Sequence, residues 1–360
     1  MNTYKILTRQ AVPGMVVSED VYTKDLNLVI AKDTILTDKI ITRLEFYSVT
    51  DFSIYSDDLS IKEEAEYMEN TFYTKIKKSE AFKRFRTAYV NTVNQLKDSI
   101  NDFANNSKEV DSDRLLSDVS NILHDCNTNI EVFNMLHCMR EFDDATYVHS
   151  LNVALISNIM GKWLNFSDEE LEVITLCGLF HDLGKLLVPN NIISKPAKLT
   201  DKEFAIVKTH TTRGYNVLKN KRIDERVRNV ALMHHERCDG SGYPNGLISY
   251  EIDPFAKLVA IADVYDAMTC ARVYRGPLCP FEVIALFEEE GYLKYDTKYL
   301  LTFLEGIVNT YIHNNVRLNN GIEGEIVMIN KLELSRPVVM TDGDFVDLSK
   351  QRNLYIEALI

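Results

Sequence analysis

The chain has 360 residues, of which 46% are hydrophobic and 26% are charged, so it can hold two or three globular domains with buried cores. A formal net charge of −13 argues against non-specific binding to nucleic acid or to an anionic membrane. The first residues lack a signal segment and no apolar run reaches the ~20 residues that span a bilayer, so we expect a soluble cytoplasmic protein. The six cysteines include no CxxC pair, which argues against a structural zinc site and a disulfide framework.

Residues 1–57 are predicted to form a small β-rich domain. Short apolar runs separated by turn residues are typical of a small sheet. These runs are 4–7, 15–17, 28–30 and 52–55. Between them Thr37 can cap a short helix whose apolar face includes Ile40 and Leu44. The domain carries no nucleophile and no cluster of metal ligands, and a regulatory role is left open.

The next part, 58–140, is predicted to be a helical linker or dimerisation region. Its aromatic and aliphatic residues recur every three or four positions and therefore share one helix face. They are Phe82, Phe85, Tyr89, Val93, Leu96 and Ile100. A polar stretch at 105–109 breaks this helix, and a second helix begins near Leu115. The pattern indicates packing, and whether that packing lies within the chain or in a homodimer stays open.

Residues 141–315 are predicted to be a helical catalytic domain, and residues 316–360 a short C-terminal β appendage. Apolar residues at helical spacing predict a buried helix over 171–180. In the appendage, extended pieces are expected at 316–318, 324–328, 337–340 and 354–356, and Asp342-Gly343 is an expected turn. The expected fold class is therefore mainly α, with small β-rich pieces at both ends of the chain.

An adjacent pair, His181-Asp182, lies at the end of the predicted helix 171–180. Held by one stretch of backbone, the imidazole and the carboxylate can reach one metal ion, and the second carboxylate oxygen can bridge to another. Five more residues of metal-binding type accompany the pair: His149, His210, His234, His235 and Asp263. The pattern indicates a two-metal centre that activates water and clamps a phosphate, and ligands rich in imidazole and without thiolate suit iron or manganese.

Two strings carry a family resemblance: HDLGK at 181–185 and HHERCDGSGYPNGL at 234–247. They resemble the HD-GYP domain, a subgroup of the HD superfamily of metal-dependent phosphohydrolases. The segments TYVHSLNVALIS, HTTRGYNVL and IADVYDAMTCARVYR resemble its other motifs, so the resemblance covers roughly 142–345. The stretch 12–44 is similar to the small domain that often precedes this one. The resemblance implies an HD-superfamily helical fold and a bacterial phosphodiesterase acting on the second messenger cyclic di-GMP.

Carried over residue by residue, the resemblance implies two ligand sets. One metal would be held by His149, His181, Asp182 and Asp263, and the other by His210, His234 and His235, with Asp182 bridging. Three positions depart from the family pattern. Ala145 replaces the carboxylate of members that bind a third metal, so a two-metal centre is expected, and Thr211 and Val273 replace prolines, which changes no ligand.

The resemblance also implies catalytic and substrate contacts. Lys185 would point at the substrate phosphate or the leaving oxygen, so Asp182 and Lys185 are the expected catalytic pair. Arg272 and Arg275 would hold phosphate and guanine. Asp266 is expected to orient a ligand or water, or to contact substrate, and Arg213 is a further substrate candidate that no spacing supports.

The predicted function is hydrolysis of cyclic di-GMP by metal-activated hydroxide, giving linear pGpG, with GMP open as a second product. One alternative is a phosphodiesterase for another cyclic dinucleotide, such as cyclic GMP-AMP, because guanine and adenine differ only at their base edges. A second alternative is a receptor that binds cyclic di-GMP without cleaving it. Receptors of that kind generally lose metal ligands, and all seven are present here.

Overall fold

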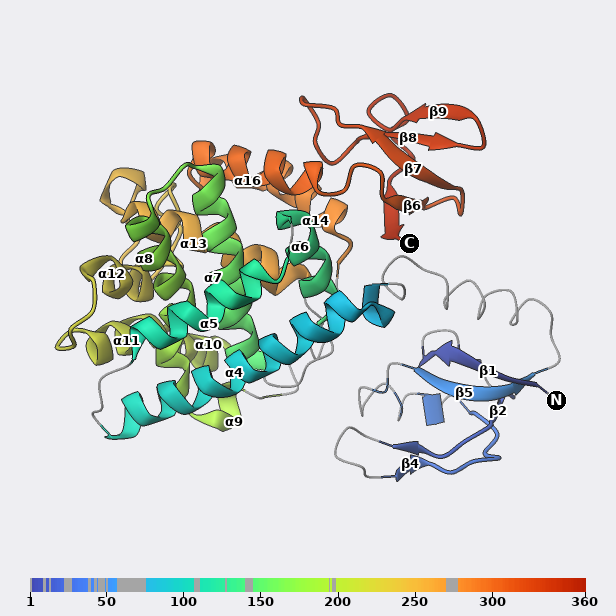
Figure 1. The fold of residues 1–360 in the computed structure, drawn as a ribbon, viewed down its shortest axis with the longest axis horizontal. Coiled ribbons are helices and arrows are strands. Elements are labelled where there is room, and N and C mark those ends of the chain that lie inside the picture. Colours follow the sequence, from blue (N-terminus) through green and yellow to red (C-terminus); the bar gives the residue numbers. More distant parts are fainter. Residues whose placement is uncertain are drawn as a thin grey trace. The chain divides into compact units, whose positions relative to one another are not determined.

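A computed structural model describes residues 2–8, 11–12, 14–22, 28–37, 40–41, 44, 49, 51–56, 76–106, 111–126, 128–139, 145–193, 195, 199–269 and 278–360. The chain forms two compact units, Met1–Lys75 and Ile76–Ile360, and the thin grey trace in Figure 1 marks what is not described. Among the described residues, no helix combines the length and the apolar character needed to cross a membrane. The finer division of the chain at residues 57, 140 and 315 stays a prediction.

The first unit is a small β structure, as predicted. Its described strands are β1 (Asn2–Leu7), β2 (Val16–Val17), β3 (Val21–Tyr22), β4 (Leu28–Ile30) and β5 (Asp51–Ser56). Strand β5 lies between β1 and β2 in an antiparallel sheet, and β3 pairs with β4. The expected cap is present, because the hydroxyl of Thr37 accepts the backbone N–H of Ile40 at 3.3 Å. Val17, Leu44 and Ile54 form the centre of this unit's apolar core.

The second unit is mainly helical. Its longer described helices are α4 (Glu80–Asn106), α5 (Ser112–His124), α6 (Asn129–Cys138), α7 (Ala145–Trp163), α8 (Asp168–Phe180), α10 (Asp201–Lys208), α11 (His210–Leu218), α12 (Glu225–Met233), α13 (Pro254–Thr269), α14 (Pro280–Leu286) and α16 (Thr297–Asn309). Short helical pieces are η2 (Leu183–Leu187), α9 (Asn190–Ile193), η3 (Ser249–Glu251), η4 (Phe287–Gly291) and α15 (Tyr292–Lys294). Helix α7 packs against α4, α8 and α13 and forms the centre of the bundle (Figure 1).

The predicted apolar face of α4 is buried along its whole length. From Phe82 to Ile100 its six aromatic and aliphatic side chains are at most 6% exposed. Because α4 packs on α5 and α7 of the same unit, this face is covered within the chain. The stripe is therefore accounted for by packing inside the bundle, which leaves the prediction of a homodimer without support from this face.

Two glycines bring backbones into direct contact at the centre of the bundle. A Cβ added to Gly178 would lie 2.4 Å from the Cα of Ala154, so α8 touches the backbone of α7. A Cβ added to Gly184 would lie 1.9 Å from the carbonyl oxygen of His210, so η2 lies directly against α11. These close approaches let residues from α7, α8 and α11 meet within one cluster.

The C-terminal residues form the predicted β appendage. Strands β6 (Asn315–Leu318), β7 (Glu323–Met328), β8 (Val338–Thr341), β9 (Asp344–Asp347) and β10 (Ile356–Leu359) make one antiparallel sheet in the order β10-β6-β7-β8-β9. Asp342 and Gly343, with φ angles of 34° and 96°, form the expected turn between β8 and β9. Strand β9 was not predicted, and β10 begins at Ile356 where the sequence suggested Leu354. The carboxylate of Glu288 accepts backbone N–H groups of Leu334 and Ser335, which ties the appendage to the bundle.

Candidate metal centre

The His181-Asp182 pair lies where the sequence placed it. Helix α8 begins with a capping box between Ser167 and Glu170 and ends at Phe180, with His181 as its C-cap. Both side chains then leave the helix end within the bundle, and they are 0% and 1% exposed. His210 opens α11, and His234 is the C-cap of α12. His235 follows His234 directly, so helix ends present five of the predicted ligands to one another. His149, on α7, and Asp263, on α13, complete the cluster from helix interiors.

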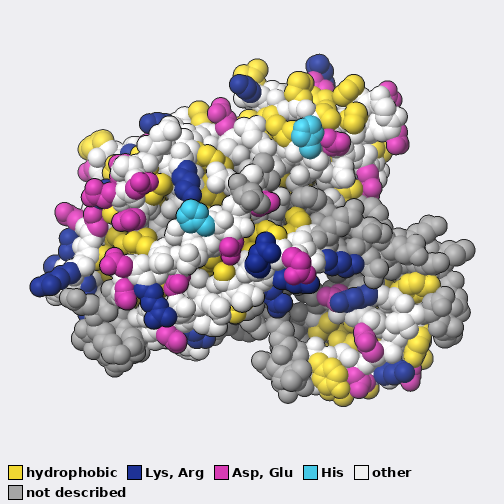
Figure 2. Space-filling view, viewed as in Figure 1, with side chains coloured by type: hydrophobic (Ala, Val, Ile, Leu, Met, Phe, Trp, Pro, Cys, Tyr) yellow, Lys and Arg dark blue, Asp and Glu magenta, His cyan; other side chains and the backbone are white. Residues whose placement is uncertain are grey.

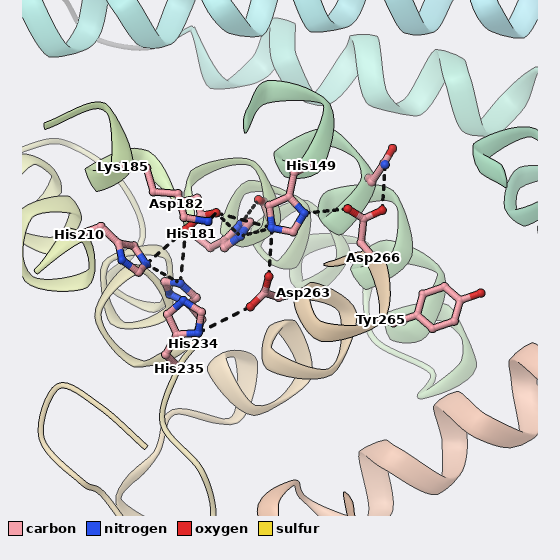
Figure 3. Close-up of polar contacts among 12 residues, drawn as sticks. His149, His181, Asp182, Lys185, His210, His234, His235, Asp263, Tyr265 and Asp266 are labelled. Carbon is pink, nitrogen blue, oxygen red and sulfur yellow. Dashed lines mark hydrogen bonds and ion pairs between the residues drawn. The ribbon is translucent and has the colours of Figure 1, made fainter. Parts of the chain in front are cut away.

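Asp182 is the geometric centre of the cluster (Figure 3). Its Oδ2 lies 3.6 Å from Nε2 of His149 and 3.3 Å from Nε2 of His181. Its Oδ1 lies 3.3 Å from Nε2 of His210 and 3.6 Å from Nε2 of His234. Each oxygen of this one carboxylate thus faces a different pair of imidazoles, which is the arrangement that a bridging ligand requires.

Two groups of side chains could each hold a metal ion, and they share Asp182. One group is His149, His181 and Asp182, and the other is Asp182, His210, His234 and His235, with ligand atoms within 4.8 Å of one another in each. Asp263 joins the first group because its Oδ1 lies 3.0 Å from Nε2 of His149. Its Oδ2 lies 3.7 Å from Nδ1 of His235, so Asp263 also spans the two groups.

Backbone carbonyls fix the orientation of three imidazoles. Nδ1 of His181 lies 2.7 Å from the carbonyl oxygen of Gly178, and Nδ1 of His210 lies 2.7 Å from that of Val207. Nδ1 of His234 lies 3.0 Å from the carbonyl oxygen of Val230. A carbonyl can only accept, so each Nδ1 must carry the hydrogen. The Nε2 lone pairs therefore point at Asp182, as is usual for metal-binding histidines held by a second partner.

Burial and charge set the ionisation of the cluster. Burial alone would raise the pKa of the Asp182 carboxyl, but the Lys185 ammonium and His181 hold it well below its usual value. Burial lowers the pKa of His210 to about 4 and also lowers the pKa of His234, so these rings are neutral and can act as ligands. Burial would lower the pKa of His149 as well, yet hydrogen bonds to Asp263 and Asp266 raise it to about 9.

The residues fit divalent metal ions. Oδ1 of Asp182 is buried and accepts no hydrogen bond from the described part of the chain. A buried carboxylate oxygen without a partner is costly, and a cation between it and the facing imidazoles would remove that cost. Imidazole and carboxylate ligands without a thiolate suit iron or manganese better than structural zinc.

Exposure shows from which side the cluster can be reached. His181, Asp182, His210 and His234 are at most 1% exposed at their side chains. In contrast, His149, His235 and Lys185 are 15%, 17% and 26% exposed. A substrate would therefore approach from the side of these three residues.

The loop after His235 is held by a residue that the sequence analysis did not single out. Glu236 is 3% exposed, and its carboxylate accepts the backbone N–H groups of Asn245 at 2.7 Å and Leu247 at 3.0 Å. The Tyr243 ring stacks on His235 with centroids 4.7 Å apart. Glu236 thus fixes the loop and, through Tyr243, covers a predicted metal ligand. A carboxylate directly after a histidine pair and before a glycine-rich loop was the available signal.

The predicted substrate contacts have different outcomes. Lys185 pairs with Asp182 and lies within the cluster. One carboxylate oxygen of Asp266 lies 2.7 Å from Nδ1 of His149, and the other accepts Nδ2–H of Asn152 at 2.8 Å. Because both oxygens are engaged and the residue is buried, the described structure does not present Asp266 to a substrate. Arg213 donates to the carbonyl of Leu187. Arg272 and Arg275, like Val273, lie outside the described residues.

Comparisons with known proteins agree with this arrangement. Residues 133–299 match the family model described as HD domain. Cyclic di-GMP phosphodiesterase PA4108 of Pseudomonas aeruginosa is 34% identical over 203 residues, which cover 56% of this chain and 49% of that protein. The 3'3'-cGAMP-specific phosphodiesterase 1 of Vibrio cholerae is 37% identical over 164 residues, which cover 44% of this chain and 38% of that protein. The chain thus spans about half the length, or less, of these relatives.

A solved structure supports the fold. The HDG"Y"P protein Bd1817 of Bdellovibrio bacteriovorus aligns with a TM-score of 0.52 and 17% identity, covering 85% of this chain and 99% of that one. At this identity the likeness concerns the fold alone. Residues 133–299 thus match the HD domain model, as the motif resemblance predicted.

Proposed function

We propose that this chain is a metal-dependent phosphodiesterase that hydrolyses cyclic di-GMP to linear pGpG, with GMP open as a second product. The observation that carries the proposal is Asp182, whose two oxygens face two separate histidine pairs inside an HD domain. The cyclic di-GMP phosphodiesterase of Pseudomonas aeruginosa supports the choice of substrate, because it is 34% identical to this chain over 203 residues.

The proposed centre holds two divalent ions, iron first and manganese second. His149, His181, Asp182 and Asp263 would hold one, and His210, His234 and His235 the other, with Asp182 bridging. When bound, two such ions supply a hydroxide nucleophile from water and neutralise the charge of a phosphodiester. The buried residues Asp182 and His234 exclude bulk water from the inner side, so the phosphate is met only on the exposed side.

Lys185 is proposed to act on the phosphate. Its side chain is 26% exposed and starts one short turn after His181, at the side from which substrate approaches. An ammonium there can neutralise a phosphate oxygen or the departing oxygen as charge develops on it. Contacts of Arg272 and Arg275 with phosphate and guanine stay predictions, and Asp266 is assigned to orienting His149 in place of a substrate contact.

An aromatic and cationic surface beside the centre supports a nucleotide substrate. Phe204 on α10 is 45% exposed and meets the Tyr243 ring edge to face at 6.5 Å. The Lys208 ammonium lies 4.8 Å from the Phe204 ring centre and 5.2 Å from that of Tyr243. An exposed ring can stack with a nucleobase while a neighbouring ammonium attracts phosphate, so the surface suits a nucleotide better than a simple phosphate ester.

One alternative substrate has a specific basis. The Vibrio cholerae relative is specific for 3'3'-cGAMP, so this chain could act on a mixed cyclic dinucleotide. A receptor that does not cleave its ligand ranks lower, because all seven predicted ligands lie in one cluster. Cytoplasmic location and the oligomeric state stay predictions.

The test is a comparison of substrates with the iron- or manganese-loaded chain. Cyclic di-GMP, 3'3'-cGAMP and cyclic di-AMP are each followed by chromatography at equal concentration. Preferential conversion of cyclic di-GMP to pGpG supports the proposal. Preferential conversion of 3'3'-cGAMP would replace the substrate, and binding without turnover of any of them would favour the receptor.

A further inference from the structure

A line of buried hydrogen bonds leads away from the metal centre. It starts at His149, whose Nδ1 lies 2.7 Å from Oδ2 of Asp266 on α13 (Figure 3). Oδ1 of Asp266 accepts Nδ2–H of Asn152 on α7 at 2.8 Å. Oδ1 of Asn152 accepts the hydroxyl of Tyr89 on α4 at 2.5 Å. Tyr89, Asn152 and Asp266 are 0%, 2% and 5% exposed, so water does not compete for these bonds.

We propose that Tyr89 and Asn152 are positioning residues for the metal ligand His149, an inference that rests on the proposed metal-dependent function. Neither residue belongs to the groups of side chains that could hold a metal. They act through Asp266, whose carboxylate they hold against Nδ1 of His149.

The chemistry of the groups allows one direction along this line. The Tyr89 hydroxyl donates to the amide oxygen of Asn152, which leaves the amide N–H₂ to donate to Asp266. The carboxylate of Asp266 can only accept, so Nδ1 of His149 must carry a hydrogen. Nε2 of His149 is then the atom that faces Asp182 and Asp263, at 3.6 Å and 3.0 Å.

Each bond in the line removes a motion from the next residue. A carboxylate held by the His149 ring alone can rotate, and the second bond from Asn152 fixes it. Because the Asp266 carboxylate can only accept, the Asn152 amide must present its nitrogen to it, and the bond from Tyr89 to the amide oxygen keeps the amide in that position. Because partners behind a ligating histidine typically change metal affinity by about 10- to 100-fold, this order should be measurable.

The line also extends the centre beyond the HD domain match. Tyr89 precedes residue 133, where that match begins, and lies on α4. The hydrogen bonds therefore join α4, α7 and α13 at a single ligand. A displacement of α4 relative to α7 would therefore change the position of His149 more directly than that of His210 or His234.

The Tyr89 hydrogen bond could also serve stability alone, because any buried tyrosine hydroxyl needs a partner. The two explanations differ in what a loss of the hydroxyl should do. If the hydrogen bond serves stability alone, removal of the Tyr89 hydroxyl lowers stability and changes the metal affinity of the two sites equally or not at all. If Tyr89 positions His149, its removal weakens the site that contains His149 and spares the site formed by His210, His234 and His235.

The experiment is manganese binding to the metal-free full-length chain by calorimetry, with electron paramagnetic resonance to separate the two sites. Tyr89→Phe removes only the hydroxyl. The matched control is Tyr147→Phe, because the Tyr147 hydroxyl also joins α7 to α4, through Oδ1 of Asn101 at 3.2 Å. Tyr89→Phe is expected to weaken one site about tenfold and leave the other within about twofold, with Asn152→Ala at least as damaging. The control should change neither site.

A double variant tests whether the residues act in one line. Once Asn152→Ala has removed the amide, Tyr89→Phe should add no further loss at the His149 site, since coupled residues are non-additive. Full additivity, an equal loss at both sites, or unchanged binding by Tyr89→Phe would each overturn the inference. A wild-type chain that binds neither manganese nor iron would instead overturn the proposed function, and the inference with it.

Discussion

Replacing Gly184 by alanine is expected to separate the two halves of the metal centre. The added Cβ would lie 1.9 Å from the carbonyl oxygen of His210 and 2.6 Å from the amide nitrogen of Gly214. Both atoms belong to backbone and cannot rotate away. Ordinary contact begins at 3.4 Å, so η2 and α11 must move apart by about 1.5 Å.

That movement is large compared with the geometry of the site. Asp182 comes directly before η2, and its Oδ1 lies 3.3 Å from Nε2 of His210 on α11. A misplacement of about 1 Å can cost about 100-fold in rate. We therefore expect Gly184→Ala to lower kcat about 100-fold, to weaken the site that contains His210, and to destabilise the chain by about 1–3 kcal/mol.

The assay combines cyclic di-GMP turnover, manganese binding and urea unfolding. Gly161→Ala is the matched control, because its Cβ would meet only side-chain atoms, Leu171 Cδ2 at 2.8 Å and Phe166 Cδ2 at 3.2 Å, which can shift. The control should keep turnover within about threefold, since volume changes that flexible side chains can absorb cost little. Wild-type turnover and metal binding by Gly184→Ala would refute the reasoning.

Three further variants test other parts of the site. Asp182→Ala should lose both metals and all turnover, as measured by metal analysis and chromatography. Full retained activity would contradict the assignment of Asp182 as the bridging metal ligand. Phe204→Ala should raise KM for cyclic di-GMP about tenfold with kcat nearly unchanged, because stacking of one base is worth about 1–3 kcal/mol, while hydrolysis of a phosphodiester without a base stays as in the wild type. For the metal-free chain, burial lowers the pKa of His210 to about 4, below its unfolded value of about 6.5. The folded state then binds fewer protons, so stability should fall as pH drops from about 6.5 towards 4, and a His210→Gln chain should show a smaller fall in its urea midpoint between pH 7.5 and 5.

Elements with a one-sided apolar pattern could be predicted from the sequence. The face of α4 from Phe82 to Ile100 was found because a spacing of three or four residues reports one-sided burial. Helix α8 was found from its dense apolar run, and its residues 173–180 are buried on all sides. Strand β9 was missed because it shows neither pattern. Its Phe345 is 69% exposed, so the strand has no clean apolar face, and it forms because the turn at Asp342 and Gly343 folds it back onto β8.

The metal ligands were predictable, and the residues that hold them were only partly so. His181 and Asp182 are adjacent in the sequence and have other histidines nearby, so the cluster can be recognised from the sequence alone. Tyr89 and Asn152 are separated by 63 positions and meet only through the packing of α4 on α7. No spacing rule connects them. Asp266 was expected to orient a ligand or contact substrate, and its two occupied oxygens favour the first role.

The most direct test of the account is a joint measurement of metal and product. The chain is purified without oxygen in the presence of iron or manganese, the bound metal is quantified per chain, and cyclic di-GMP is followed by chromatography. Two metals per chain together with linear pGpG are the predicted result. A chain that binds cyclic di-GMP tightly but holds no metal, or that holds metal and forms no product, would contradict the account.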